Sequence, residues 1–167
     1  MEVRITGMQE LQNALQNVGR GEILLAADRG LKKGGMAIVA EAQDNLRRNG
    51  TNTTGLLSQS GKVRKSSEGE GYDAGFMQGE KNYAGAVEYG RRAGRMPPPD
   101  MLDAWAYKKM HLHDRKASRT IGWAIAKHIA KNGTRPHPFF APAVQKYQPR
   151  ILNIVRDEIA KVVNRNV

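Results

Sequence analysis

The stretch Arg135-Pro136-His137-Pro138-Phe139-Phe140-Ala141-Pro142-Ala143 decides how the C-terminal part of the chain is built. Its first two prolines favour an extended approach, because the residue before a proline is pushed out of the helical region. The two adjacent phenylalanines then offer their rings to an apolar site. Pro142 suits the first turn of a helix, where its missing N–H is not needed. We therefore expect a clamp that fixes a C-terminal helix to a small body, which is typical of a structural part.

An apolar stripe follows this stretch and predicts a single C-terminal helix. A helix stop at Asn132-Gly133 precedes the stretch, so the last helix is expected to be a separate element. The members of the stripe recur every three to four residues, which places them on one helix face: Val144, Tyr147, Ile151, Ile154, Val155, Ile159 and Val162.

The N-terminal part of the chain also predicts helices. Residues 8–18 carry apolar side chains at helical spacing, and residues 22–48 predict one long amphipathic helix. Gly34-Gly35 lies inside the long helix, where each glycine costs about 1 kcal/mol against alanine. We expect a bend or a close helix contact at this pair. The stripe expected to face the core consists of Leu24, Ala27, Leu31, Ile38, Ala42 and Leu46.

Short strands are predicted in the middle of the chain, after a polar loop over residues 49–60. Alternating patterns and turn signals predict strands at 61–67, 71–78 and 83–89. The expected fold class is therefore α+β: a small antiparallel sheet of three to four strands packed with the long N-terminal helix and the C-terminal helix. The length predicts a single domain over residues 1–167, with a basic helical insertion at about 91–134.

The insertion begins with a basic loop at residues 90–99, which ends in three prolines. Asp100 and Asp114 are each expected to cap a helix. The second of these helices should bury one apolar stripe before the stop at Asn132-Gly133. That stripe consists of Ala117, Ile121, Ala124, Ile125, His128 and Ile129.

Positive charge is concentrated in the same region. The chain has 167 residues and a formal net charge of +11, and residues 91–138 hold eleven basic residues against three acidic ones. Such a surface favours a polyanion such as nucleic acid. A solvated face that serves solubility explains the charge equally well, because no recognised nucleic-acid module accompanies it.

Several classes of function find no support in the residues. The chain contains no cysteine, and no apolar run is long enough to cross a membrane. His111 and His113 stand two residues apart, so on a helix they do not face the same way and are not expected to bind a metal. No nucleophile or acid–base constellation can be assembled, so neither an enzyme nor a cofactor is expected. Glu88 is a candidate for a buried or inter-subunit ion pair with an arginine.

Three motifs resemble the tail-completion, or head–tail joining, family of tailed bacteriophages with long non-contractile tails. Thr54-Gly55-Leu56-Leu57-Ser58-Gln59-Ser60 is similar to the family's Thr-Gly-x-Leu-x-x-Ser signature. Tyr83-Ala84-Gly85-Ala86-Val87-Glu88-Tyr89-Gly90 resembles its Tyr-Ala-x-x-Val-Glu-aromatic-Gly strand. The stretch 135–143 resembles its Pro-x-Pro-Phe-aromatic-x-Pro-Ala motif. The segment 91–132, with Trp105 and Trp123, departs from members that join the last two motifs by a short loop.

The resemblance implies a non-enzymatic structural protein of the virion. A ring at the neck of the particle would complete and terminate the tail tube and join it to the DNA-filled head, leaving a channel for DNA. The implied partners are further copies of the chain, in a hexameric ring or alternatively a dodecamer, together with head connector or stopper proteins and the tail tube protein. The alternative function is a basic DNA-binding accessory protein, which would need the helix at 114–131 to contact DNA.

Two sets of residues are predicted to serve these roles. The candidates for interface and docking are Tyr83, Val87, Glu88, Tyr89, Arg91, Arg92, Arg95, Phe139 and Phe140. The candidates for contact with DNA or an acidic partner are Lys62, Arg64, Lys65, Lys108, Lys109, Arg115, Lys116 and Arg119.

Overall fold

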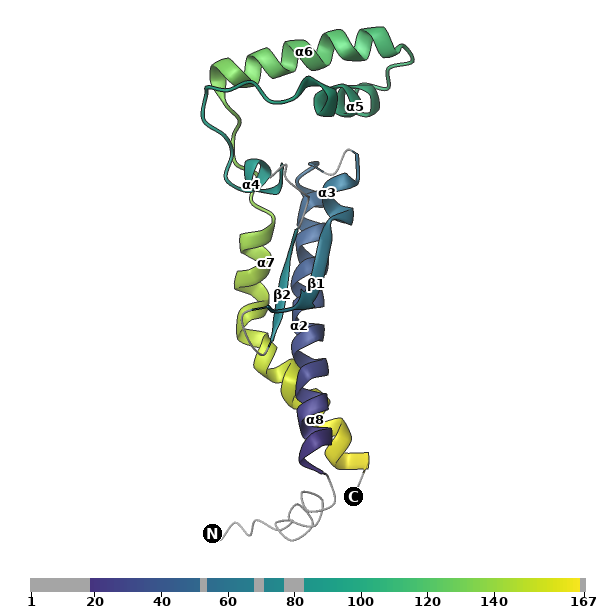
Figure 1. The fold of residues 1–167 in the computed structure, drawn as a ribbon, viewed down its shortest axis with the longest axis vertical. Helices are drawn as coiled ribbons and strands as arrows, with labels where there is room; N and C mark the ends of the chain where they lie inside the picture. Colours follow the sequence, from purple (N-terminus) through teal and green to yellow (C-terminus); the bar gives the residue numbers. More distant parts are fainter. Residues whose placement is uncertain (1–18, 52–53, 68–70, 77–82, 166–167) are drawn as a thin grey trace, which may run out of the picture. The chain divides into compact units, whose positions relative to one another are not determined.

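The computed structural model describes residues 19–51, 54–67, 71–76 and 83–165 (Figure 1). The helix predicted at 8–18 lies outside these residues. The described elements are mostly helical and include one two-stranded sheet, which confirms an α+β chain in outline. In chain order they are α2 (Arg20–Arg48), α3 (Leu56–Gln59), β1 (Gly61–Lys65), β2 (Tyr72–Phe76), α4 (Tyr83–Glu88), α5 (Pro99–Lys109), α6 (Arg115–Asn132), α7 (Phe140–Tyr147), the 3-10 turn η1 (Gln148–Arg150) and α8 (Ile151–Arg165).

The chain divides into two compact units, and the boundaries fall inside helices and strands. The first unit comprises Met1–Ala37, Val63–Asp73 and Gln145–Val167. The second comprises Ile38–Lys62 and Ala74–Val144. The predicted insertion therefore belongs to the second unit.

In the first unit, the beginning of α2 packs closely against α8 (Figure 1). A methyl group added at Gly30 would lie 2.7 Å from the Val155 Cα, and one added at Gly34 would lie 3.3 Å from the Ile151 Cγ1. The close helix contact expected at the paired glycines is therefore confirmed. Gly30 is the position that requires glycine, because a methyl group there would collide with the backbone of α8.

The stripe predicted for α2 is correct only in its later half. Ile38, Ala42 and Leu46 are buried, whereas Leu24 and Leu31 are 61% and 39% exposed. In the first unit the buried row consists of small residues instead: Ala26, Gly30 and Gly34. Close packing against α8 requires small residues at the contact, so the leucines lie on the other side of the helix.

A buried carboxylate reinforces the contact between α2 and α8. Glu158 of α8 is 7% exposed. Its Oε1 accepts hydrogen bonds from the Lys161 Nζ at 2.7 Å and the Lys33 Nζ at 2.8 Å. These two bonds lower the pKa of Glu158 to about 2.

The first unit also ties its part of the sheet to α2. The Tyr72 hydroxyl donates a hydrogen bond of 2.7 Å to the Asp28 Oδ2. This bond, with a smaller contribution from burial, raises the pKa of Tyr72 above its ordinary value. Lys65 lies 3.9 Å from the same aspartate.

The C-terminal helix is interrupted, although the sequence predicts a single one. α7 ends at Tyr147, the 3-10 turn η1 follows, and α8 begins at Ile151. Pro149 lies in the turn, and a proline both lacks the N–H needed inside a helix and clashes with the preceding turn. The seven predicted stripe residues are nevertheless all half-buried, so the predicted face is confirmed.

The second unit has its core around the later half of α2. The buried apolar side chains include Ile38, Val39 and Leu46 of α2, Leu57 of α3 and Phe139. Gly55 begins α3 with a φ of 76°, in the left-handed region that glycine adopts readily. Residues 56–59 therefore form a short helix inside the segment 49–60, for which the sequence predicts only a loop.

The sheet has two strands, β1 and β2, in antiparallel order, and the predicted strand at 83–89 is wrong. Residues 83–88 form the helix α4 instead. Six residues are too few for a strand pattern to exclude a helix, since Tyr83 and Val87 share a face in either reading. The buried Glu88 lies at the end of α4, where it meets the amides that begin α7.

The insertion forms a pair of helices, α5 and α6 (Figure 1). The Asp114 side chain accepts from the amides of Lys116 and Ala117, as predicted for a helix cap. Asp100 lies inside the first turn of α5 rather than at its cap, because Pro98 takes that position. Gly133 ends α6 as predicted, and its amide donates to the Ile129 carbonyl.

Small residues rather than the predicted stripe form the buried face of α6. These are Ser118, Gly122 and Ala126, spaced four apart. A methyl group at Gly122 would lie 2.8 Å from the Asp103 backbone nitrogen on α5. The isoleucines of the predicted stripe are half-buried, whereas Ala124 and His128 are exposed. The stripe is therefore rotated, because the helices approach through their smallest residues.

Candidate functional site

The segment before α7 is held from several sides, as the clamp prediction requires. The Phe139 ring is 1% exposed and meets the Phe76 ring edge to face at 5.0 Å between centroids. On α2, the Asn45 side-chain amide donates to the Phe139 carbonyl at 2.8 Å, and that of Asn49 donates to the Pro138 carbonyl at 3.0 Å. The predicted clamp is confirmed, and Phe76, Asn45 and Asn49 are its partners.

Glu88 is the polar centre of this clamp. It is 7% exposed, and its carboxylate accepts hydrogen bonds from the amides of Phe139 at 2.8 Å, Phe140 at 2.9 Å and Ala141 at 3.0 Å. These amides lie at the beginning of α7, where free N–H groups and the helix dipole favour a negative charge. Glu88 therefore caps α7 instead of forming the predicted pair with an arginine within this chain.

The insertion leaves and rejoins the second unit at one point. Arg91 and Thr134 form an antiparallel backbone bridge with hydrogen bonds of 3.1 and 2.8 Å. Gly90 and Gly133 flank this bridge with φ values of 70° and 73°. A methyl group at Gly90 would lie 2.6 Å from the Thr134 carbonyl oxygen. The two glycines thus allow the backbone at Arg91 and the backbone at Thr134 to approach closely. This contact holds the two ends of the insertion together.

The nine predicted interface residues divide into buried, half-buried and exposed sets. Val87, Glu88 and Phe139 are buried within the second unit, where they hold the clamp. Tyr83, Arg91 and Phe140 are half-buried, and burial raises the pKa of Tyr83. The residues that remain accessible for docking are Tyr89, which is 80% exposed, and the exposed arginines Arg92 and Arg95.

A groove of about 810 Å³ runs beside this region of the second unit. Tyr83 and Val87 of α4, Trp105 of α5 and Ile129 of α6 contribute apolar side chains to its lining. Arg135 adds a positive charge. The sequence does not predict this groove, because its lining comes from five separate segments.

The eight predicted basic contact residues are all exposed, and they are divided between the two compact units. Lys62, Lys108, Lys109, Arg115, Lys116 and Arg119 belong to the second unit, while Arg64 and Lys65 belong to the first. Two of them already contact other side chains of this chain. The Arg64 Nε lies 3.6 Å from an Asp73 oxygen, and the Arg115 guanidinium lies 4.3 Å from the centre of the Tyr107 ring.

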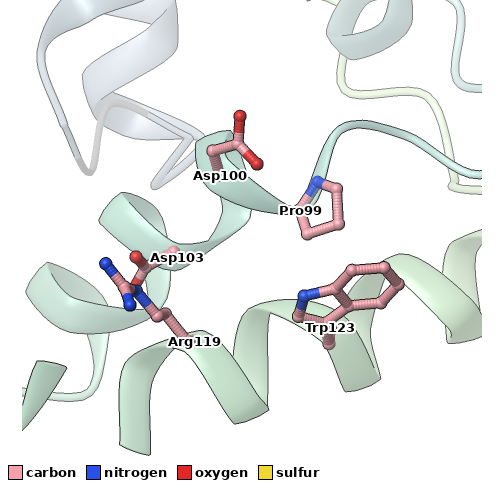
Figure 2. Close-up of a pocket in the computed structure, with 5 residues that line it drawn as sticks. All are labelled: Pro99, Asp100, Asp103, Arg119 and Trp123. Atoms are coloured by element: carbon pink, nitrogen blue, oxygen red, sulfur yellow. The ribbon is translucent and has the colours of Figure 1, made fainter. Parts of the chain in front are cut away.

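A smaller pocket of about 310 Å³ lies between α5 and α6. Figure 2 shows Arg119 and Trp123 of α6 together with Pro99, Asp100 and Asp103 of α5 around it. Asp103 also accepts a hydrogen bond from the Ser118 hydroxyl. Arg119 therefore lies beside the acidic residues of α5. The lysines of α6 lie on the other side of Trp123 around the helix. The spacing from Lys116 to Trp123 and Lys127 in the sequence could have indicated this surface.

In the part of the chain that the structure describes, no group of three or more histidine, cysteine, aspartate or glutamate side chains is placed to hold a metal ion. Among the helices in the described ranges, none is both long and apolar enough to span a bilayer.

A comparison with known protein families indicates the class of protein. Residues 9–90 match the model of the HK97-gp10-like family, described as "Bacteriophage HK97-gp10, putative tail-component". This match confirms the resemblance to a family of phage tail proteins. The match indicates a tail component of a bacteriophage, and with it a structural protein of the virion. No curated protein and no solved structure gives a significant match.

The matched region contains two of the three motifs seen in the sequence. In the first, Gly55 starts α3, Leu57 is buried, and the Ser60 hydroxyl donates to the Leu57 carbonyl at 2.7 Å. In the second, Glu88 receives the amides of the third motif. The insertion and the stretch 135–143 lie beyond the match, so the second motif joins the family region to the rest of the chain.

Proposed function

We propose that the protein forms a ring at the head–tail interface of a tailed phage. The ring would terminate the tail tube and join it to the DNA-filled head, leaving a channel for DNA. A ring of six copies is the favoured assembly and a dodecamer is the alternative. The observation that carries this proposal is the match of residues 9–90 to a phage tail-component family.

Two surfaces of the chain suit packing between copies. On α2, the side opposite Gly30 and Gly34 exposes large apolar side chains, and such patches commonly mark an interface. β1 and β2 are both edge strands of their two-stranded sheet, and an edge offers unpaired backbone groups to a neighbour. Head-to-tail contacts of this kind close into a ring when the rotation permits. The exposed apolar residues of α2 are Leu24, Leu25, Leu31 and Met36.

Deletion of the gene tests the proposal most directly. Electron microscopy of the resulting particles should show DNA-filled heads beside separate, abnormal or over-long tails. Normal infectious particles would reject a tail-completion role. Native mass spectrometry of the purified protein or of isolated tails would then count the copies, and an order other than six or twelve would reject the predicted ring.

The exposed arginines of the loop between α4 and α5 test the docking role. We expect Arg92→Gln with Arg95→Gln to leave the melting temperature unchanged, because both side chains are exposed, and to lower the yield of joined particles. The control is Arg156→Gln with Arg165→Gln, which removes the same charge from exposed positions of α8. Equal yields from both variants would show that the loop arginines serve only solubility.

The alternative is a basic DNA-binding accessory protein, and the lysines exposed on α6 are the observation that favours it. The deletion experiment separates the two functions, because loss of an accessory protein leaves the joining of heads to tails intact. A virion position is likewise expected only of the ring.

A further inference from the structure

One side of α6 carries four exposed side chains in a single row: Lys116, Trp123, Lys127 and Lys131. They are named here the basic row. Their spacing of seven, four and four residues keeps them on one side of a helix with 3.6 residues per turn. Trp123 is 51% exposed in the middle of the row. The lysines of the row lie away from Ser118, Gly122 and Ala126, which face α5, and Trp123 lies at the edge of the small pocket against α5 in Figure 2.

The charge of the row is not neutralised within the described chain. The 18 residues of α6 include no aspartate or glutamate. Of the acidic residues nearby, Asp114 is engaged in capping α6 and Asp103 accepts from Ser118, while Asp100 lines the small pocket in Figure 2. In the ranges that the structure describes, no lysine of the row forms an ion pair with them.

We propose that the basic row binds the sugar–phosphate backbone of double-stranded DNA without sequence preference. From Lys116 to Lys131 the row extends about 22 Å at 1.5 Å per residue. A duplex of that length carries about 13 phosphate charges. Lysine meets phosphate as a point charge, and the row contains no asparagine or glutamine that could read the edge of a base. Trp123 offers an apolar surface for the sugars between phosphates.

The geometry of α6 favours DNA over a membrane. A helix that lies in a lipid surface turns a broad apolar face toward the acyl chains. On α6 the isoleucines are half-buried on the α5 side, and Trp123 is the one large apolar side chain of the row. An acidic protein could match the three lysines too, but its carboxylates would have to fall at their particular spacing along about 22 Å. A duplex carries a phosphate charge about every 1.7 Å, so it meets the lysines at any spacing.

This inference adds to the proposed ring a surface that meets the passing DNA, and in that respect it rests on the proposed function. The binding itself requires neither a ring nor a particle. A negative binding result would therefore leave the deletion experiment to decide the tail-completion role, and normal particles after deletion would leave the binding result standing.

The test is a titration of the full-length protein into a fluorescein-labelled 30-base-pair duplex, read by anisotropy at several salt concentrations. The row variant is Lys116→Gln with Lys127→Gln and Lys131→Gln. The control is Arg20→Gln with Arg29→Gln and Lys32→Gln, which removes three exposed charges from α2. The row variant should lower the slope of log affinity against log salt by about 2.7 and weaken binding on the order of a hundredfold at physiological salt. The control should behave like the wild type.

A second measurement uses the indole of the row. The chain has 2 tryptophans, so Trp105→Phe leaves Trp123 as the single fluorophore. Addition of duplex should change its emission, whereas polyglutamate and anionic vesicles should not. Equal affinities and salt slopes for the row variant and the control would overturn the proposal. It would equally be overturned by a response to polyglutamate or vesicles in the absence of any response to DNA.

Discussion

The two compact units each contain a buried glutamate, and the two carboxylates are satisfied in different ways. Glu88 in the second unit and Glu158 in the first are both 7% exposed. Glu88 accepts from three backbone amides of the segment Phe139–Ala141. Glu158 accepts from the ammonium groups of Lys33 and Lys161, whose side chains are 54% and 66% exposed. Glu88 therefore binds backbone groups of its own unit, whereas Glu158 binds exposed side chains.

The difference indicates what each carboxylate can do. Backbone amides keep their positions as long as α7 is in place, so Glu88 and α7 depend on each other. Salt screens the attraction between the exposed lysines and the carboxylate, and water can take the place of either lysine. Ion pairs of this kind therefore contribute little net stability. We expect loss of any one contact of Glu88 to release the whole clamp. The contact around Glu158 should instead weaken gradually as the pH falls or the salt concentration rises.

Removal of the Phe139 ring should produce the largest effect. Phe139→Ala deletes a ring that is 1% exposed and leaves a cavity against Phe76, which costs about 3–5 kcal/mol. Phe140→Ala is the matched control and should cost less, because that ring is half-buried. Urea denaturation measures both. An unchanged midpoint for Phe139→Ala would show that the ring does not anchor the clamp.

Replacement of Glu88 should cause the second-largest loss of stability. Glu88→Gln keeps the shape of the side chain but presents an NH₂ group to amides that need an acceptor, so we expect a loss of about 2–4 kcal/mol. The comparison is sharpened by a double-mutant cycle with Phe139→Ala. The two changes should be strongly non-additive, because both release the same segment. Glu158→Gln combined with Phe139→Ala should be additive, and coupling of similar size in both cycles would contradict the distinction between the two carboxylates.

The clamp shows how much the sequence could predict. The proline and phenylalanine pattern of 135–143 predicts an extended approach followed by a helix, and the structure confirms both. The Asp114 cap and the stop at Gly133 are also predicted, since capping depends on neighbouring residues alone. The role of Glu88 could not be predicted, because its partners lie about fifty residues further along the chain.

The errors share a physical reason. Residues 83–89 alternate over too short a length to separate a strand from a helix, and the contact of Glu88 with α7 favours the helix α4. The stripes predicted for α2 and α6 assume that large apolar residues face the core. In both helices the closest contacts use small residues such as Gly30 and Gly122 instead. The choice between the two faces depends on the distance to the neighbouring helix, which a single sequence does not specify.

The smallest effect concerns Glu158 and its dependence on pH. Its hydrogen bonds with Lys161 and Lys33 lower its pKa to about 2, from an ordinary value of 4.5. A carboxyl group whose pKa is lower in the folded state stabilises the fold fully above the ordinary pKa. That contribution is lost as the pH falls from about 4.5 toward 2. Glu158→Gln removes the titrating group and should remove this part of the pH dependence.

Hydrogen exchange of the α8 amides reports the effect where it occurs. At pH 7 we expect Glu158→Gln to exchange slightly faster than the wild type, and this difference should shrink as the pH is lowered through 4 to 3. It should also shrink in high salt, because the partner lysines are exposed to screening ions. The difference caused by Glu88→Gln at the α7 amides should persist in salt, since backbone donors carry no mobile charge. If salt reduced both differences equally, the two carboxylates would be held by the same kind of interaction and the contrast between the units would be rejected.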